Sequence, residues 1–128
     1  MAHKLLLVED EHMLAYTLGE LITLLYGFEV FLAGSVAESL RLIETQQPAV
    51  ILLDLHLADG SGMQVLEGAR RLGSKAIIYV ITGFEDPELD VQARSLGAHD
   101  YLVKPVDPKE LKAKLDEAVG RVTHTQGD

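Results

Sequence analysis

The sequence predicts an α/β domain in which a five-stranded parallel sheet is doubly wound, with five helices on its two faces. Unbroken apolar runs, of which residues 50–53 are the clearest, are typical of strands that are buried on both faces. Segments with apolar residues at helical spacing separate these runs, so that strand and helix alternate five times. The 128 residues, 48% of them hydrophobic and 24% charged, suit one globular domain.

The strands are expected where apolar runs stop at turn signals. Their predicted ranges are 4–8, 28–33, 50–54, 77–81 and 99–103. The second of these runs alternates between apolar and polar residues, which predicts an edge strand. We therefore expect the flavodoxin-like strand order 2-1-3-4-5, in which the second strand lies at an edge of the sheet.

The helices are expected between the strands, each with sequence signals at its ends. They should run from 11 to 26, from Ser35 to the break at Pro48, through 66–72 to Gly73, from 87 to 96 and from 108 to 121. Ser35 and Glu38 form a predicted capping box for the second helix. Asp86 is a predicted N-cap for the fourth helix, with Pro87 at its first position.

Composition excludes several classes of function. A net charge of −9 argues against direct binding of nucleic acid, which requires a basic face. The absence of cysteine excludes disulfides, thiolate chemistry and zinc sites built on sulfur. No apolar run is long enough for a signal peptide or a membrane span, so we expect a soluble, cytoplasmic protein without membrane contact. We expect one domain, residues 1–122, and a flexible C-terminal tail, residues 123–128.

Polar residues follow four of the predicted strands at their carboxyl ends. They are Glu9, Asp10, Asp54, Thr82 and Lys104. Each has a plain structural interpretation when taken alone: a surface acid, a helix cap, a turn hydroxyl or a solvated lysine. Since parallel strands end at one edge of the sheet, we expect these residues to meet in one crevice. Three carboxylates, a hydroxyl and an ammonium group would then share one site.

Neighbouring carboxylates repel each other, which raises their pKa unless a cation neutralises them. Mg²⁺ suits a site of few carboxylates, with waters and a phosphate completing its coordination. An aspartate can also attack phosphorus and form an aspartyl phosphate. Asp54 fits the nucleophile, while Lys104 and Thr82 fit the groups that stabilise the charge of the new dianion.

The sequence resembles the receiver domains of bacterial two-component response regulators from residue 4 to about residue 120. The similarity rests on five elements in the right order: LLLVEDE, VILLDLHLADGSG, VITGF, Tyr101 and Lys104-Pro105. The resemblance implies phosphorelay signalling, in which the domain is a phosphoacceptor and at most catalyses its own phosphorylation and dephosphorylation. A histidine kinase or a histidine phosphotransfer protein would supply the phosphoryl group to Asp54.

The resemblance also implies a role for each site residue. Mg²⁺ would be held by Glu9, Asp10, Asp54 and the backbone carbonyl of His56. Lys104 and Thr82 would contact the phosphoryl oxygens. Thr82 and Tyr101 would form the pair that switches a surface of the domain when Asp54 is phosphorylated.

Two positions depart from the usual receiver sequence, and a third is variable among receiver domains. Glu9 stands where many members have aspartate, and its longer side chain is expected to reach the metal through water. Ala58 replaces the proline often found four residues after the acceptor, which predicts a less rigid loop. The side chain of His56 could compete for the metal, act as a general base or face solvent. Together with Phe84, it is expected to set the lifetime of the phosphoryl group.

Two other classes of function share parts of this pattern. The first is a small Mg²⁺-dependent phosphatase that forms an aspartyl phosphate. Enzymes of the haloacid dehalogenase type require a second aspartate two residues after the nucleophile, where this chain has His56. The second is a flavodoxin-like binding module that is never phosphorylated. Loss of the acceptor aspartate or of the lysine would indicate such a module, and this chain has both Asp54 and Lys104.

A protein-binding face is expected on one side of the domain. It would consist of the helix at 87–96, the strand at 99–103 and the helix at 108–121. Tyr101 would rotate between this face and the interior, and so change the binding of a downstream protein or a second copy. The acidic run at 85–90 would set the charge preference of the face.

Overall fold

The computed structural model describes residues 2–57, 59–83 and 87–126, with side chains described as far as residue 122. Its main sheet is parallel and has the strand order β2-β1-β3-β6-β7. These strands are β1 (Lys4–Val8), β2 (Glu29–Ala33), β3 (Val50–Asp54), β6 (Ile77–Thr82) and β7 (Asp100–Val103). The order confirms the predicted 2-1-3-4-5 arrangement, with the second strand at an edge.

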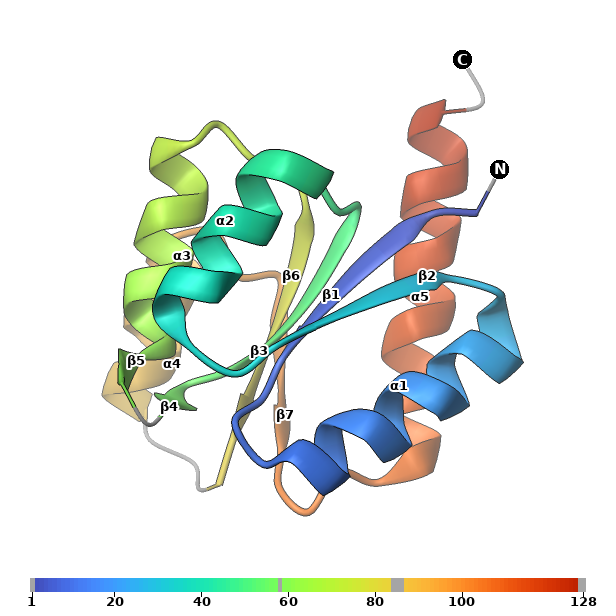
Figure 1. Ribbon diagram of the computed structural model, residues 1–128, viewed down its shortest axis with the longest axis horizontal. Helices are drawn as coiled ribbons and strands as arrows, with labels where there is room; N and C mark the ends of the chain where they lie inside the picture. Colours follow the sequence, from blue (N-terminus) through green and yellow to red (C-terminus); the bar gives the residue numbers. More distant parts are fainter. Residues whose placement is uncertain (1, 58, 84–86, 127–128) are drawn as a thin grey trace.

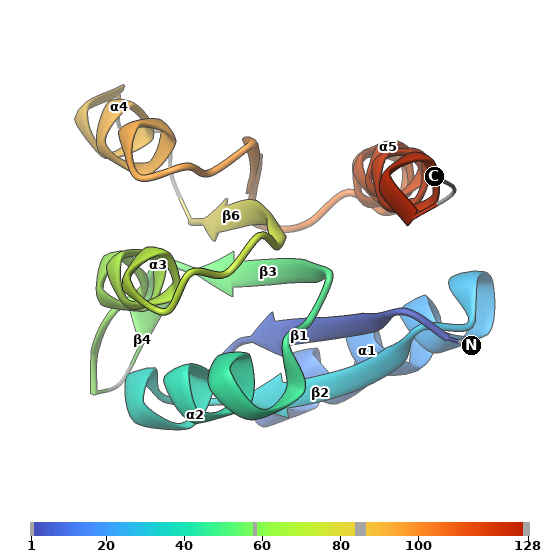
Figure 2. The same ribbon diagram turned by 90° about the horizontal axis from the view of Figure 1, so that it is seen from above.

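Five helices cover the two faces of this sheet (Figures 1 and 2). They are α1 (His12–Tyr26), α2 (Val36–Gln46), α3 (Gly62–Arg71), α4 (Pro87–Ser95) and α5 (Pro108–Gln126). Figure 2 shows α1 and α5 on one side of the sheet and α2, α3 and α4 on the other. The doubly wound α/β fold is therefore confirmed. No helix in the described ranges combines the length and apolar character needed to span a membrane.

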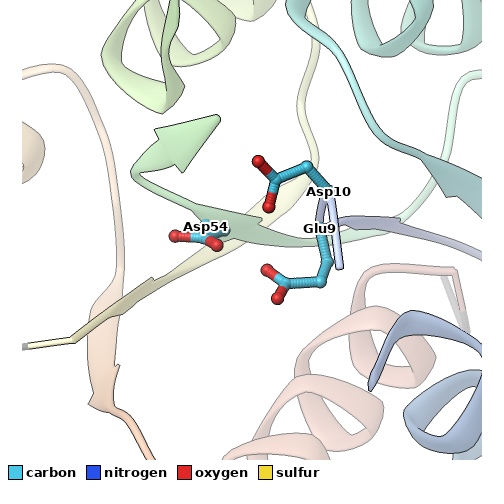
Figure 3. Close-up of side chains that lie close together, drawn as sticks. All are labelled: Glu9, Asp10 and Asp54. Atoms are coloured by element: carbon cyan, nitrogen blue, oxygen red, sulfur yellow. The ribbon is translucent and has the colours of Figure 1, made fainter. Parts of the chain in front are cut away.

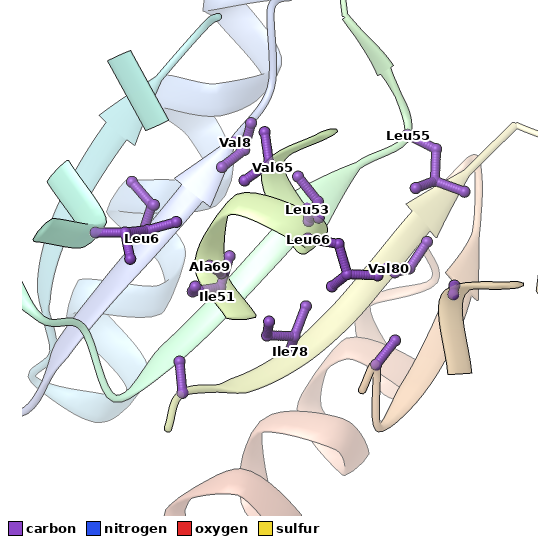
Figure 4. Packing of buried hydrophobic residues seen from close by; sticks show 14 of the residues in the cluster. Leu6, Val8, Ile51, Leu53, Leu55, Val65, Leu66, Ala69, Ile78 and Val80 are labelled. Carbon is purple, nitrogen blue, oxygen red and sulfur yellow. The ribbon is translucent and has the colours of Figure 1, made fainter. Parts of the chain in front are cut away.

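The apolar runs of the central strands are continuous because each strand feeds two cores. Alternate residues such as Leu6, Ile51 and Ile78 pack against α2, α3 and α4 (Figure 4). The intervening residues, such as Leu52 and Tyr79, pack against α1 and α5. Since side chains alternate across a strand, burial on both faces requires an apolar residue at every position.

The predicted capping box of α2 is present in a modified form. The Glu38 N–H donates to the Ser35 hydroxyl over 3.1 Å, but the Glu38 carboxylate accepts from the N–H of Gly34 over 2.9 Å. A full capping box, which was not predicted, begins α3 with Ser61 and Gln64. The predicted N-cap Asp86 lies outside the described residues, as do Ala58, Phe84 and Glu85.

Two features of the backbone differ from the predictions. The loop after β3 contains an antiparallel pair of short strands, β4 (His56–Leu57) and β5 (Gly60–Ser61). Helix α5 continues to Gln126, beyond the expected end at residue 121, while the flexibility of residues 123–128 stays a prediction. Val122 is buried against the core near this end, and no proline interrupts the last turns.

Candidate functional site

The carboxylates predicted to converge do lie together at the carboxyl edge of the sheet. Glu9 and Asp10 directly follow β1, and Asp54 is the last residue of the neighbouring strand β3. One possible ligand atom from each of the three lies within 4.8 Å of the others (Figure 3). Glu9 and Asp54 are only 3% and 2% exposed, while Asp10 is half-buried. The three side chains therefore form a compact acidic cluster.

Lys104 directly follows β7, an edge strand of the sheet, and its side chain reaches these carboxylates. Its Nζ donates to Glu9 Oε1 over 3.0 Å and to Asp54 Oδ2 over 2.9 Å. Its backbone N–H donates to the carbonyl of Thr82 over 2.7 Å, so the pairing of β6 with β7 continues beyond Val103. The extended pairing brings the ammonium group to the acidic cluster.

The carboxylate oxygens of Asp54 are held from two directions. The backbone N–H of His56 donates to Asp54 Oδ1 over 2.9 Å, and Lys104 bonds the other oxygen. The His56 side chain is exposed, in agreement with the interpretation as a solvent-facing histidine. The binding of a metal ion by the His56 backbone carbonyl stays a prediction.

Thr82 lies at the same edge, in the next strand. Asp54 pairs with Ile81 in the sheet, and Thr82 follows as the last residue of β6. The threonine is buried and lines a cavity of about 170 Å³ beneath α4. Tyr101, from β7, is half-buried and lines the same cavity. The two residues expected to form a switch pair thus border one space.

The electrostatics of the site distinguish its two buried carboxylates. Burial, together with a hydrogen bond to Asp54, raises the pKa of Glu9 to about 7, although Lys104 opposes the rise. Burial would also raise the pKa of Asp54, but hydrogen bonds with Glu9, Lys104 and the His56 N–H outweigh that effect and lower it. Without a cation, the proton that this pair takes up below about pH 7 therefore resides on Glu9, and Asp54 stays ionised.

The pKa of Lys104 shifts in the direction that keeps its charge. Burial alone would lower this pKa, but the hydrogen bonds to Asp54 and Glu9 outweigh burial and raise it. A charged ammonium group beside Asp54 stabilises the negative charge that this carboxylate already carries.

Gly62 has a role at the site that the sequence did not indicate. A Cβ at this position would collide with the carbonyl oxygen of Asp54 and lie 2.8 Å from the Cα of Leu55. The N–H of Gly62 also donates to the carbonyl of Leu55 over 3.0 Å. The first turn of α3 therefore packs directly against the backbone of Asp54 and Leu55. The glycine-rich composition of the loop was the available signal.

Asp59 was also missed, because its contact is distant in sequence. Its carboxylate accepts hydrogen bonds of 3.0 and 3.1 Å from the N–H of Val36, at the start of α2. A carboxylate at a helix N-terminus is favoured by the helix dipole. This contact ties the loop that follows Asp54 to a second helix.

Residues 5–116 match the family model of the response regulator receiver domain. The chain belongs to this family. The receiver domain is 39% identical over 94 residues to the acid tolerance regulatory protein ActR of Rhizobium meliloti, covering 73% of this chain and 48% of ActR. It is 34% identical over 111 residues to the photosynthetic apparatus regulatory protein RegA of Rhodobacter capsulatus, covering 87% and 60%. It thus spans about half the length of these relatives.

Solved receiver domains share the fold. The signal receiver domain of a putative Luxo repressor protein from Vibrio parahaemolyticus superposes with a TM-score of 0.90 at 26% identity, covering 98% of this chain and 96% of that chain. A CheY-like response regulator receiver domain protein from Methanospirillum hungatei gives 0.81 at 30% identity, covering 94% and 99%. The resemblance seen in the sequence is therefore confirmed, and the family is one of signalling domains.

Proposed function

We propose that Asp54 accepts a phosphoryl group from a histidine kinase or a histidine phosphotransfer protein. The observation that carries this proposal is a buried, ionised aspartate that is bonded to a lysine and flanked by two further carboxylates. A carboxylate oxygen of Asp54 would attack phosphorus as the bond to the histidine nitrogen breaks. The electron pair of that bond would stay on the imidazole, which takes up a proton.

The donor set at the site fits Mg²⁺. Three clustered carboxylates face one ammonium group, so the cluster keeps an excess of negative charge that a divalent cation would neutralise. Glu9, Asp10, Asp54 and the backbone carbonyl of His56 would hold the ion. When bound, Mg²⁺ would neutralise charge on the phosphoryl oxygens.

The remaining roles fall to the chain's own donors. Lys104 Nζ lies 2.9 Å from Asp54 Oδ2 and would bind a phosphoryl oxygen once Asp54 is phosphorylated. The hydroxyl of Thr82 would donate to another phosphoryl oxygen. The His56 N–H, which already fixes Asp54 Oδ1, would hold the acceptor while the bond to phosphorus forms.

The output of the domain would be a changed surface. Contact between Thr82 and the phosphoryl group would vacate space in the cavity that both Thr82 and Tyr101 line, and the ring of Tyr101 would enter it. The face of α4, β7 and α5 would then bind a downstream protein or a second copy. Relatives such as the transcriptional regulatory protein KdpE of Staphylococcus aureus are about twice as long as this chain. With its net charge of −9, this domain itself would not bind DNA.

Incubation with acetyl phosphate and Mg²⁺, followed by mass spectrometry of the intact protein, tests the acceptor. The unaltered protein should retain one phosphate, and Asp54→Asn should take up none. Asp116→Asn, which alters an exposed aspartate on α5, is the matched control and should be phosphorylated normally. Phosphate that appears on Asp54→Asn would contradict the proposal, whereas rapid release of inorganic phosphate would favour a phosphatase and no reaction an inert binding module.

A further inference from the structure

The cavity beneath α4 is large enough to receive an aromatic ring. Its volume of about 170 Å³ is comparable to that of an engineered protein cavity of ~150 Å³ that binds benzene. Within α4, which the structure describes completely, Ala93 is the one buried residue. The helix therefore covers the cavity without filling it, and Tyr101 stands at its wall.

Arg94, in the last turn of α4, lies directly over the ring of Tyr101. The guanidinium carbon is 5.6 Å from the ring centroid. Its Nε donates to Asp90 over 3.0 Å within α4, and its Nη2 donates to Asp100 over 3.0 Å. A third nitrogen donates to the carbonyl of His99 over 3.3 Å. One side chain thus joins α4 to the start of β7 and to the ring.

Asp100 links Arg94 to the backbone of Tyr101. The carboxylate oxygen that binds Arg94 also accepts the backbone N–H of Tyr101 over 2.8 Å. The other carboxylate oxygen accepts from Lys114 on α5. Asp100 is therefore fixed to β7 and α5, and its pKa is lowered because the hydrogen bonds from Lys114 and its other donors outweigh burial, which alone would raise it. The anchor for Arg94 remains charged.

A single exposed ion pair stabilises a protein little. Arg94 differs because its guanidinium is held at a fixed place by two carboxylates and a carbonyl, and the ring beneath it is attracted to the cation. Movement of the ring away from Arg94, into the cavity, would give up this attraction. The bonds to Asp100 and to the His99 carbonyl also join α4 to the start of β7 and so limit movement of the helix, while the bond to Asp90 orients the guanidinium within α4.

We propose that Arg94 is a positioning residue that holds Tyr101 at the wall of the cavity and thereby keeps the α4-β7-α5 face in its unphosphorylated form. The inference rests on the proposed switch of Thr82 and Tyr101 and adds the group that sets its starting equilibrium. Phosphorylation of Asp54 would have to overcome the hold of Arg94 before the ring enters the cavity.

The test labels the four tyrosines with 3-fluorotyrosine and follows Tyr101 by fluorine NMR in unphosphorylated protein. Tyr101→Phe identifies its resonance, and the shift on replacing H₂O by D₂O reports exposure of the ring. Arg94→Gln should increase the ratio of buried to exposed ring about two- to fivefold, the factor that corresponds to an exposed cation–π contact. Arg94→Lys, which keeps the charge but lacks the planar guanidinium, should give a smaller change. Arg41→Gln alters an exposed arginine on α2 and should change nothing.

The same variants are treated with acetyl phosphate and Mg²⁺. Arg94→Gln should take up phosphate to the same extent as the unaltered protein, because Arg94 contacts no residue of the acidic cluster. An unchanged or more exposed Tyr101 in Arg94→Gln would overturn the role of Arg94. Failure of the unaltered protein to take up phosphate would instead overturn the proposed function, and the ring measurement, made without phosphate, would still decide on Arg94. Arg94→Lys decides the question if Arg94→Gln does not fold.

Discussion

Glu9 should make the binding of Mg²⁺ depend on pH. In the folded protein without a cation, burial raises its pKa from 4.5 to about 7. Between these two values the folded state holds more protons than the unfolded state. The contribution of Glu9 to the free energy of unfolding is therefore fully present below pH 4.5 and is lost as the pH rises to about 7.

The same proton competes with a metal ion. At pH 6 most Glu9 side chains carry a proton that has to leave before the carboxylate can face a cation, whereas at pH 8 few do. At one pH unit below the pKa, removal of the proton costs about 1.4 kcal/mol. The dissociation constant of Mg²⁺ should therefore be about tenfold higher at pH 6 than at pH 8.

Isothermal titration with Mg²⁺ at both pH values measures this difference, and melting temperatures with and without Mg²⁺ provide a second measure. Glu9→Gln, which has no ionisable group at this position, should reduce the difference between pH 6 and pH 8. Glu67→Gln alters an exposed glutamate on α3 and should preserve it. Equal Mg²⁺ affinity of the unaltered protein at the two pH values would refute this account of the site.

Three further predictions concern packing and the switch. Gly62→Ala should lower the free energy of unfolding by about 1–3 kcal/mol in chemical denaturation, since the new Cβ meets the backbone of Asp54; Gly120→Ala, which has open space on α5, should not. Arg70→Ala should lower the free energy of unfolding by about 1–2 kcal/mol, because Arg70 donates to the carbonyls of Leu96 and Gly97 just after α4, while Arg71→Ala should have little effect. Thr82→Ala should still be phosphorylated but should lose phosphorylation-dependent partner binding or dimerisation, as measured by analytical ultracentrifugation; undiminished coupling would contradict the switch.

The fold was predictable because its signals are local. A strand buried on both faces needs an apolar residue at every position. The run from Val50 to Leu53 meets this requirement, and it can be recognised without knowing which elements lie beside it. The cluster of Glu9, Asp10 and Asp54 followed from the rule that parallel strands end at one edge. Both inferences used periodicity and strand direction, which the sequence carries directly.

The missed features depend on contacts between distant elements. Asp59 caps a helix that begins 23 residues earlier in the chain. Arg94 reaches Tyr101 only because α4 packs over β7, and the position of its guanidinium depends on Asp100. Gly62 is required by a close approach of two backbones, which no pattern of side chains reveals. Each depends on atomic positions that follow from packing rather than from periodicity.

The geometry suggests how added charge at Asp54 would reach the surface. Lys104 bonds Asp54 through its side chain and Thr82 through its backbone N–H, so one residue joins Asp54 to the end of β6. Tyr101 lies three residues earlier on the strand that leads to Lys104. A phosphoryl group that draws Lys104 and Thr82 toward it would therefore act on both walls of the cavity at once. In the proposed mechanism Arg94 would oppose that movement from α4, and the balance between the two attractions would set the response of the face.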